Sequence, residues 1–325
     1  TPEPPGESFC NSFPQAGTAA LIRQAFQHFR GIGAERLRRL QEAGIRDWDE
    51  LAAFTDNLSL GDTGRARLRA EIEQCDRAIA ERNMHYLVES FGGSDQWRIL
   101  AHFFPSASYF DIETSGLDLD SHVTVVSCYH RDRVYNFVHG ENMEAFLDLL
   151  EDVELLVSFN GASFDVPQIL KLYHIPDLPC AHIDLRWLCY HAAMPGGLKS
   201  IEKRLGINRP RDLQGVDGEE AVWLWRLWEN QGQEKARQQL LRYCSADSVS
   251  LKLLSAKLLS MNDVQVECPA PDELWSMLGG IETPELGFQT LPPAAETSGL
   301  MAQDAAHDPM RERMVRHLRM MRNRK

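Results

Sequence analysis

The segment YFDIETSGL, residues 109–117, restricts the fold most strongly, because it places two acids inside a run that otherwise has the pattern of a buried strand. Alternate side chains of a strand share a face, so Asp111 and Glu113 point the same way. Like charges at this spacing repel, and burying an unpaired carboxylate costs several kcal/mol. A divalent cation would stabilise both acids, and hard oxygen ligands suit Mg²⁺ or Mn²⁺. The alternative is an edge strand with a solvated acidic face.

Two later segments carry further candidates for the same site. The run LVSFNGASFD has the pattern of an apolar strand that leads through Asn160 into a helix beginning near Asp165. Sites in α/β sheets tend to form just beyond strand ends, although an acid at a helix start is also favoured by the helix dipole. The helical run LLRYCSADSVSLKLL places Tyr243 and Asp247 four residues apart on one helix face. Such a pair also occurs on exposed helix faces without a functional role.

The hydrophobic pattern predicts an α/β fold. Strand-like runs at 108–113, 122–130 and 134–140 precede alternating helix and strand and a last long helix near 233–259, which indicates one mixed sheet flanked by helices. Helical spacing before them predicts an all-α region that includes one long helix over 64–91. The expected parts are a disordered N-terminus (1–15), a small all-α domain (16–91), the α/β domain (92–262), a Pro-rich linker (263–307) that could hold a short helix at DELWSML (272–278), and a basic amphipathic helix (308–325).

Composition and charge limit the functional classes. The chain has 325 residues, of which 43% are hydrophobic and 25% charged, as in soluble globular proteins. The net charge of −13 does not by itself indicate nucleic-acid binding, but segment 308–325 carries seven Arg and Lys against two acids. That segment could add non-specific affinity for nucleic acid, or dock on a partner protein or an anionic membrane surface. We expect no transmembrane segment, no signal peptide and a cytoplasmic location.

The cysteines predict reduced thiols. There are seven, scattered and without a CxxC pair. The run CAHIDLRWLCYH brings Cys180, His182, Cys189 and His191 close together in sequence, but their spacing matches no common zinc pattern. Ordinary helix and strand packing is therefore favoured over a zinc site.

The order of the acidic motifs resembles a known family. Asp111-x-Glu113, then Asp165 within Asn-Gly-x-x-Phe-Asp, then Tyr243-x-x-x-Asp247 resemble the three exonuclease motifs of the DEDD superfamily, in its DEDDy type. That family has a ribonuclease H-like fold. The segment GLKSIEKRLGINRPRDLQGVDGEEAVWLW is similar to the one that links the second and third motifs in the YprB-like branch of predicted exonucleases. The resemblance covers about half of the chain.

The resemblance implies a metal-dependent 3′–5′ exonuclease that hydrolyses single-stranded nucleic acid with two metal ions. Asp111 would bridge the two ions, while Glu113 and Asp247 would complete the shell of the first. Asp165 would hold the second ion through water, and Tyr243 would orient or deprotonate the attacking water. The alternative is a non-catalytic nucleic-acid-binding module or scaffold with the same fold.

An N-terminal element adds a second candidate for nucleic-acid contact. The run GIGAERLRRLQEAGI resembles a helix-hairpin-helix element, whose glycine turn exposes backbone N–H groups to a phosphate. The residues concerned are Gly31, Ile32 and Gly33, with Arg30, Arg36, Arg38 and Arg39 nearby. Such hairpins also serve purely structural roles. The remaining candidates for positioning substrate are Leu117, Asn160 and Phe164, for which core or capping roles are the alternative.

Three charged residues near the motifs are given ordinary roles. Lys199 could touch a phosphate, but its place in GLKSIEKRL is typical of a solvated helix lysine. Asp184 is interpreted as a helix-start acid and Asp212 as a loop acid.

Overall fold

Five strands form one mixed sheet in the order β3-β2-β1-β4-β5. The strands are β1 (Ala107–Thr114), β2 (Val123–His130), β3 (Arg133–Val138), β4 (Leu155–Ser158) and β5 (Ala181–Asp184). β2 pairs antiparallel with β1 and β3, whereas β4 runs parallel to β1 and β5. The predicted α/β fold with a mixed sheet is confirmed. The acidic strand β1 lies in the middle of that sheet, which rules out the edge-strand alternative.

The computed structural model describes residues 17–116, 121–214 and 218–279. Leu117, the predicted disordered N-terminus, the linker beyond residue 279 and the predicted basic helix at 308–325 lie outside these ranges. Within the described ranges, no helix combines the length and the hydropathy that a membrane span requires.

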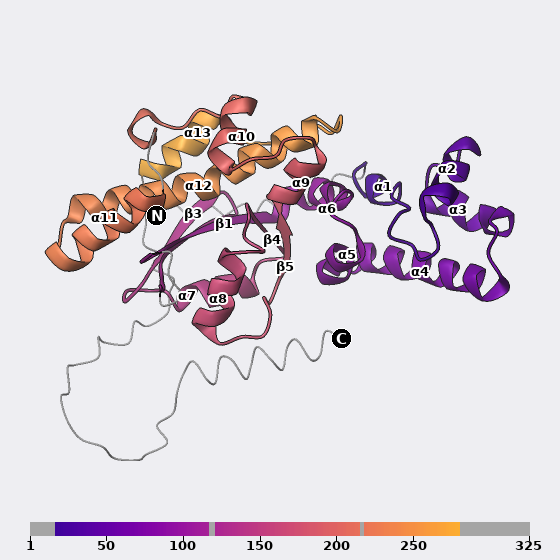
Figure 1. Cartoon of the computed structure of the whole chain (residues 1–325), viewed down its shortest axis with the longest axis horizontal. Helices are drawn as coiled ribbons and strands as arrows, with labels where there is room; N and C mark the ends of the chain where they lie inside the picture. The colour runs from indigo at the N-terminus through magenta and orange to yellow at the C-terminus, as the bar shows by residue number, and fades with distance from the viewer. Residues whose placement is uncertain (1–16, 117–120, 215–217, 280–325) are drawn as a thin grey trace, which may run out of the picture.

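Helices cover both faces of the sheet (Figure 1). On one face, α7 (Ala145–Glu151) and α8 (Asp165–Tyr173) share an apolar core with Phe110 and Ile112 of β1. On the other face lies the 27-residue α12 (Glu234–Ser260), whose leucines share a second core with Tyr109. Because β1 alternates, Asp111 and Glu113 project to the same face as Tyr109, toward α12. The remaining helices on this side are α9 (Leu185–His191), α10 (Leu198–Leu205), α11 (Gly218–Gln231) and α13 (Pro271–Ser276).

An all-helical region precedes the sheet, as predicted, and extends to one side of it (Figure 1). Its helices are α1 (Ala19–Ile22), α2 (Ala34–Glu42), α3 (Trp48–Phe54), α4 (Asp62–Ala80), α5 (Met84–Ser90) and α6 (Gln96–Phe103). Single 3₁₀ turns also occur, at Thr55–Asn57, Phe104–Ser106, Arg211–Leu213 and Met277–Gly279. Buried Trp48 anchors this region through a 2.7 Å hydrogen bond from its Nε1 to the Ala25 carbonyl. Its apolar residues belong to the same core that lies under α12.

The single helix predicted over 64–91 is in fact two helices, α4 and α5. The chain breaks at Arg82, which has a left-handed φ of 54°, and the Asn83 side chain then caps α5 by accepting from the Tyr86 amide. The Arg82 guanidinium forms an ion pair with Glu154, which precedes β4, and lies 5.0 Å from the Phe103 ring centroid. These distant contacts stabilise a bend that helical periodicity alone does not reveal.

The chain continues to pack after α12, where the sequence predicts a linker from residue 263 with a short helix near 272–278, which corresponds to α13. In the described part of that segment, α13 contacts α12, and Leu274 and Leu278 are buried in the core. The many prolines in this segment are compatible with packing because Pro271 lies at the first position of α13, where no backbone N–H is needed.

Candidate metal centre

The two acids of β1 face α12. Asp111 lies opposite Ser127 of β2, and Glu113 is buried opposite Val125. The Cys244 thiol of α12 lies 3.6 Å from the Asp111 carbonyl oxygen and 3.9 Å from its carboxylate Oδ2. Ligand atoms of Asp111, Glu113 and Cys244 lie within 4.8 Å of one another, and among the described residues they form the group whose spacing suits a metal ion.

The turn after β4 brings Asp165 to the same strand. Asp165 begins α8, and its Oδ1 accepts a 3.2 Å hydrogen bond from the amide of Ile112, the residue between the two acids of β1. Gly161 makes this tight turn possible, since a Cβ at that position would collide with the Ser158 side chain. The structure therefore places the second motif directly against the first.

A buried acid that sequence reasoning treats as ordinary holds this turn in place. Asp184 caps α9, as predicted, by accepting from the Arg186 amide at 2.9 Å. Its two oxygens also accept from the amides of Asn160 (2.7 Å) and Ala162 (3.1 Å). Asn160 has a φ of 65°, and its side-chain oxygen accepts from the Arg186 guanidinium. Phe164 packs against the core under α8.

The third motif lies buried in α12. Asp247 accepts a hydrogen bond from the Arg209 guanidinium, which also binds both oxygens of Glu202, at 2.8 and 2.6 Å. The three side chains are 9%, 6% and 4% exposed, respectively. Arg209 and Glu202 are absent from the sequence prediction, because nothing in the local pattern of α10 and the loop after it marks an ion pair with α12.

Tyr243 has a cationic neighbour. The Nζ of Lys199 donates a 2.7 Å hydrogen bond to the Tyr243 hydroxyl and lies 4.7 Å from the centroid of its ring. Lys199 is exposed to solvent, as predicted, but its ammonium group is engaged at the site rather than only solvated.

The electrostatics of the cluster favour uptake of positive charge. Burial, followed by the charges of Asp247 and Asp165, raises the pKa of Asp111 well above its ordinary value. Burial and the charge of Asp247 do the same to the pKa of Glu113. Burial also raises the pKa of Asp165 to about 7. The carboxyl groups of Asp111, Glu113 and Asp165 are thus hard to ionise where they lie.

The donor set fits a divalent metal ion. Four carboxylates converge between β1, α8 and α12, and among the described residues the cations named in these contacts are Arg209 and Lys199. Hard carboxylate oxygens are the ligands that Mg²⁺ and Mn²⁺ prefer. Burial and the nearby acids raise the pKa of Cys244 well above its ordinary value, so its thiol stays protonated as a neighbour of Asp111.

The two cysteines of the run at 180–191 are buried in different cores. Cys180 belongs to the core under α7 and α8, whereas Cys189 belongs to the core on the α12 face. The His182 ring is hydrogen-bonded to the Ser158 hydroxyl at 2.8 Å. Packing and hydrogen bonding in strand and helix therefore account for Cys180, Cys189 and His182.

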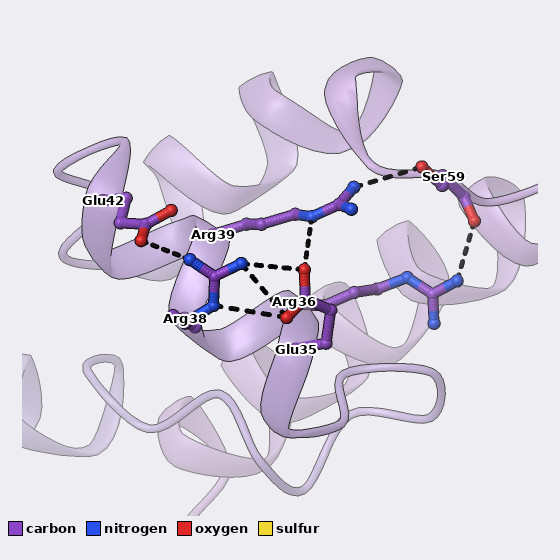
Figure 2. A network of polar contacts seen from close by, with 6 residues as sticks. All are labelled: Glu35, Arg36, Arg38, Arg39, Glu42 and Ser59. Carbon is purple, nitrogen blue, oxygen red and sulfur yellow. Dashed lines mark hydrogen bonds and ion pairs between the residues drawn. The ribbon is translucent and has the colours of Figure 1, made fainter.

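The glycine turn of the helix-hairpin-helix-like element precedes α2. Gly31 has a φ of 92°, Ile32 is buried, and Gly33 is the residue before the first turn of the helix. The arginines after the turn are engaged within the element (Figure 2). Arg36 donates to the Gly31 and Ser59 carbonyls, both at 2.7 Å, while Arg38 and Arg39 form ion pairs with Glu35, and Arg38 also pairs with Glu42. Three of the four arginines near this turn are therefore held by contacts within the protein.

Residues 108–259, which contain the sheet and the acidic cluster, match the sequence model of a family described as the RNase_H superfamily. The solved structures that are similar to the chain include the family B DNA polymerase from the hyperthermophilic archaeon Pyrobaculum calidifontis, at 19% identity and a TM-score of 0.37. That similarity covers 49% of this chain and 26% of the polymerase chain. No curated protein matches the sequence.

Proposed function

We propose that this protein is a metal-dependent 3′–5′ exonuclease that hydrolyses single-stranded nucleic acid. The observation that carries the proposal is the convergence of Asp111, Glu113, Asp165 and Asp247, from three elements far apart in sequence, into one largely buried cluster. The RNase H-like match of residues 108–259 supports the same interpretation. A cluster this costly to bury is expected to serve a ligand, because replacing one of its acids by a neutral residue would stabilise the fold.

The four acids would hold two divalent ions, Mg²⁺ or Mn²⁺. Asp111 would bridge them, Glu113 and Asp247 would hold one, and Asp165 the other. Bound ions of this kind lower the pKa of water toward neutrality and stabilise negative charge on phosphate oxygens. The turn fixed by Asp184 orients the Asp165 carboxylate, and Arg209 orients that of Asp247.

The surroundings of Tyr243 favour a positioning role over that of a base. Burial, followed by the charges of Asp247 and Glu113, raises the pKa of the phenol above its ordinary value, so it stays protonated at neutral pH. Because Lys199 donates to the phenol oxygen, the phenol proton remains available for an acceptor. We infer that Tyr243 donates a hydrogen bond that orients the reacting water or phosphate.

The variant Tyr243→Phe tests that role. It removes the hydroxyl and keeps the ring, so turnover should fall by about ten- to a hundredfold, while the affinity for Mn²⁺ measured by calorimetry stays within about twofold. A matched loss of Mn²⁺ affinity would instead make Tyr243 part of the metal-binding structure. Unchanged turnover would remove Tyr243 from the mechanism.

A labelled oligonucleotide tests the proposed function itself. With Mg²⁺ or Mn²⁺, a 5′-labelled single strand should shorten stepwise from its 3′ end, and EDTA should stop the reaction. Tight binding without shortening would support the alternative, a nucleic-acid-binding module that does not cleave. Parallel DNA and RNA strands, single and paired, would identify the preferred substrate.

A further inference from the structure

Two large aromatic side chains are exposed side by side on α9. Trp187 is 51% and Tyr190 59% exposed, and their ring centroids lie 6.2 Å apart in an edge-to-face arrangement. They are three residues apart and so share one face of the helix. Exposing large aromatic side chains to water is unfavourable, so an adjacent pair on one helix face indicates an interaction surface.

This helix starts beside the turn that leads to the acidic centre, the cluster of Asp111, Glu113, Asp165 and Asp247. Its capping residue Asp184 holds the turn that leads to Asp165, and Arg186 in its first turn donates to Asn160 of the same turn. A seven-residue helix is only about 10 Å long. The two rings therefore lie within about two helical turns of the segment that carries the second acidic motif.

The segment that contains the rings and α10 is basic. Between residues 185 and 210 the sequence contains one acid, Glu202, and it is buried in the ion pair with Arg209. Four other cations in this segment are exposed: Arg186, Lys199, Lys203 and Arg204. In a chain with a net charge of −13, this local excess of positive charge suits a polyanion.

Lys199 and Lys203 connect this surface to the centre. They lie four residues apart on α10, hence on one face of that helix, and Lys199 reaches the Tyr243 hydroxyl. Arg204 points back toward the loop after α9, donating to the Pro195 carbonyl at 3.4 Å. Positive charge thus extends from the centre along α10 and returns beside α9.

We propose that α9, the loop after it and α10 form a track that guides a single-stranded nucleic acid into the acidic centre. Bases stack on Trp187 and Tyr190, and phosphates contact Arg186, Lys203 and Arg204. Exposed aromatics bordered by cations bind single strands with little sequence preference, because every base has a π-face. The proposal rests on the proposed function, since the acidic centre is where the 3′ end would react.

Binding without cleavage tests the track. The affinities of 5′-fluorescein-labelled 12-mers of thymidine and of uridine are measured by anisotropy in EDTA. The double variant Trp187→Ala/Tyr190→Ala should bind roughly five- to a hundredfold more weakly for each base that no longer stacks. The control is Trp223→Ala on α11, which removes a tryptophan that is 55% exposed, and its affinity should equal that of the wild type. All three side chains are exposed, so the folded protein should tolerate these substitutions.

The salt dependence of the binding affinity tests the contribution of the cations separately from that of the aromatic rings. The double variant Lys203→Gln/Arg204→Gln should reduce the slope of log affinity against log salt by about 0.7 for each phosphate that the variant no longer binds. The track is overturned if the aromatic double variant binds within twofold of the wild type, or if Trp223→Ala weakens binding as much. The same measurements distinguish failure of the track from failure of the exonuclease proposal. If the aromatic variant binds more weakly but the wild type does not shorten the strand in Mn²⁺, only the exonuclease proposal is wrong. If the wild type shortens the strand but the aromatic variant binds with unchanged affinity, only the track is wrong.

Discussion

Replacing Asp111 by Asn is expected to lower cleavage by more than about a hundredfold and, in EDTA, to stabilise the folded protein. The loss of activity should exceed the ten- to hundredfold effect typical of residues that only orient metal ligands, because Asp111 is proposed to be a ligand itself. The gain in stability has a separate cause. Asn has nearly the same shape but no charge, so it removes repulsion from Asp247, Asp165 and Glu113.

The stability change should depend on pH with a definite sign. A carboxyl group whose pKa is raised in the folded state binds its proton more tightly there than in the unfolded chain. Its contribution to stability is therefore fully present below the unfolded pKa, and it disappears as the pH rises through the folded pKa. For Asp165 this window runs from about 4 to about 7. In EDTA, the wild type should therefore lose stability from this cluster across that range, and Asp111→Asn should lose less.

Denaturant unfolding at several pH values, with and without Mn²⁺, measures both effects. The control is Asp212→Asn, which removes an exposed acid that Arg242 holds by hydrogen bonds. Its effect should be small and should not follow the same pH window, because the neighbouring arginine lowers the pKa of Asp212. Cleavage by Asp111→Asn at the wild-type rate would show that Asp111 is not a ligand, and a loss of stability in EDTA would show that its charge is compensated.

The sequence predicts the parts of the fold that depend on short-range patterns. The alternation along β1 and the spacing of Tyr243 and Asp247 determine which side chains share a face, and both pairs do lie on the face between the sheet and α12. Strand β5 is absent from the prediction, because its four residues, Ala181–Asp184, are too few to show a period and are followed at once by helix. The missing strand matters for the site, because Asp184 at the end of β5 fixes the turn before Asp165.

Long-range contacts account for the remaining differences. The break near Arg82 depends on Glu154, which lies 72 residues away. The Arg209–Asp247 contact joins residues 38 positions apart, and the bond from Lys199 to Tyr243 spans 44. Charged residues of this kind look like ordinary solvated groups in the sequence, because an ion pair leaves no periodic pattern. Only the folded arrangement shows which cations belong to the centre.

Replacing Arg209 by Met is the second change with a large expected effect. It leaves the buried carboxylate of Glu202 without a partner and Asp247 without its donor, and breaking one side of a buried ion pair typically costs about 3–5 kcal/mol. The exposed pair of Arg242 with Asp212 provides the control, because Arg242→Met should change the free energy of unfolding by no more than about 1 kcal/mol. Unfolding in EDTA measures both.

A second variant separates stability from metal binding. In Arg209→Met/Glu202→Met the unpaired buried charge on α10 is gone, so most of the lost stability should return, since buried ion pairs can often be exchanged for apolar residues of similar volume. The donor that fixes the Asp247 carboxylate is still missing, and the affinity for Mn²⁺ should therefore remain about ten- to a hundredfold below that of the wild type. If the double variant instead binds Mn²⁺ more tightly than the wild type, Arg209 competes with the ion for Asp247 rather than positioning it. The two roles predict opposite signs, so one calorimetric titration of a folded protein distinguishes them.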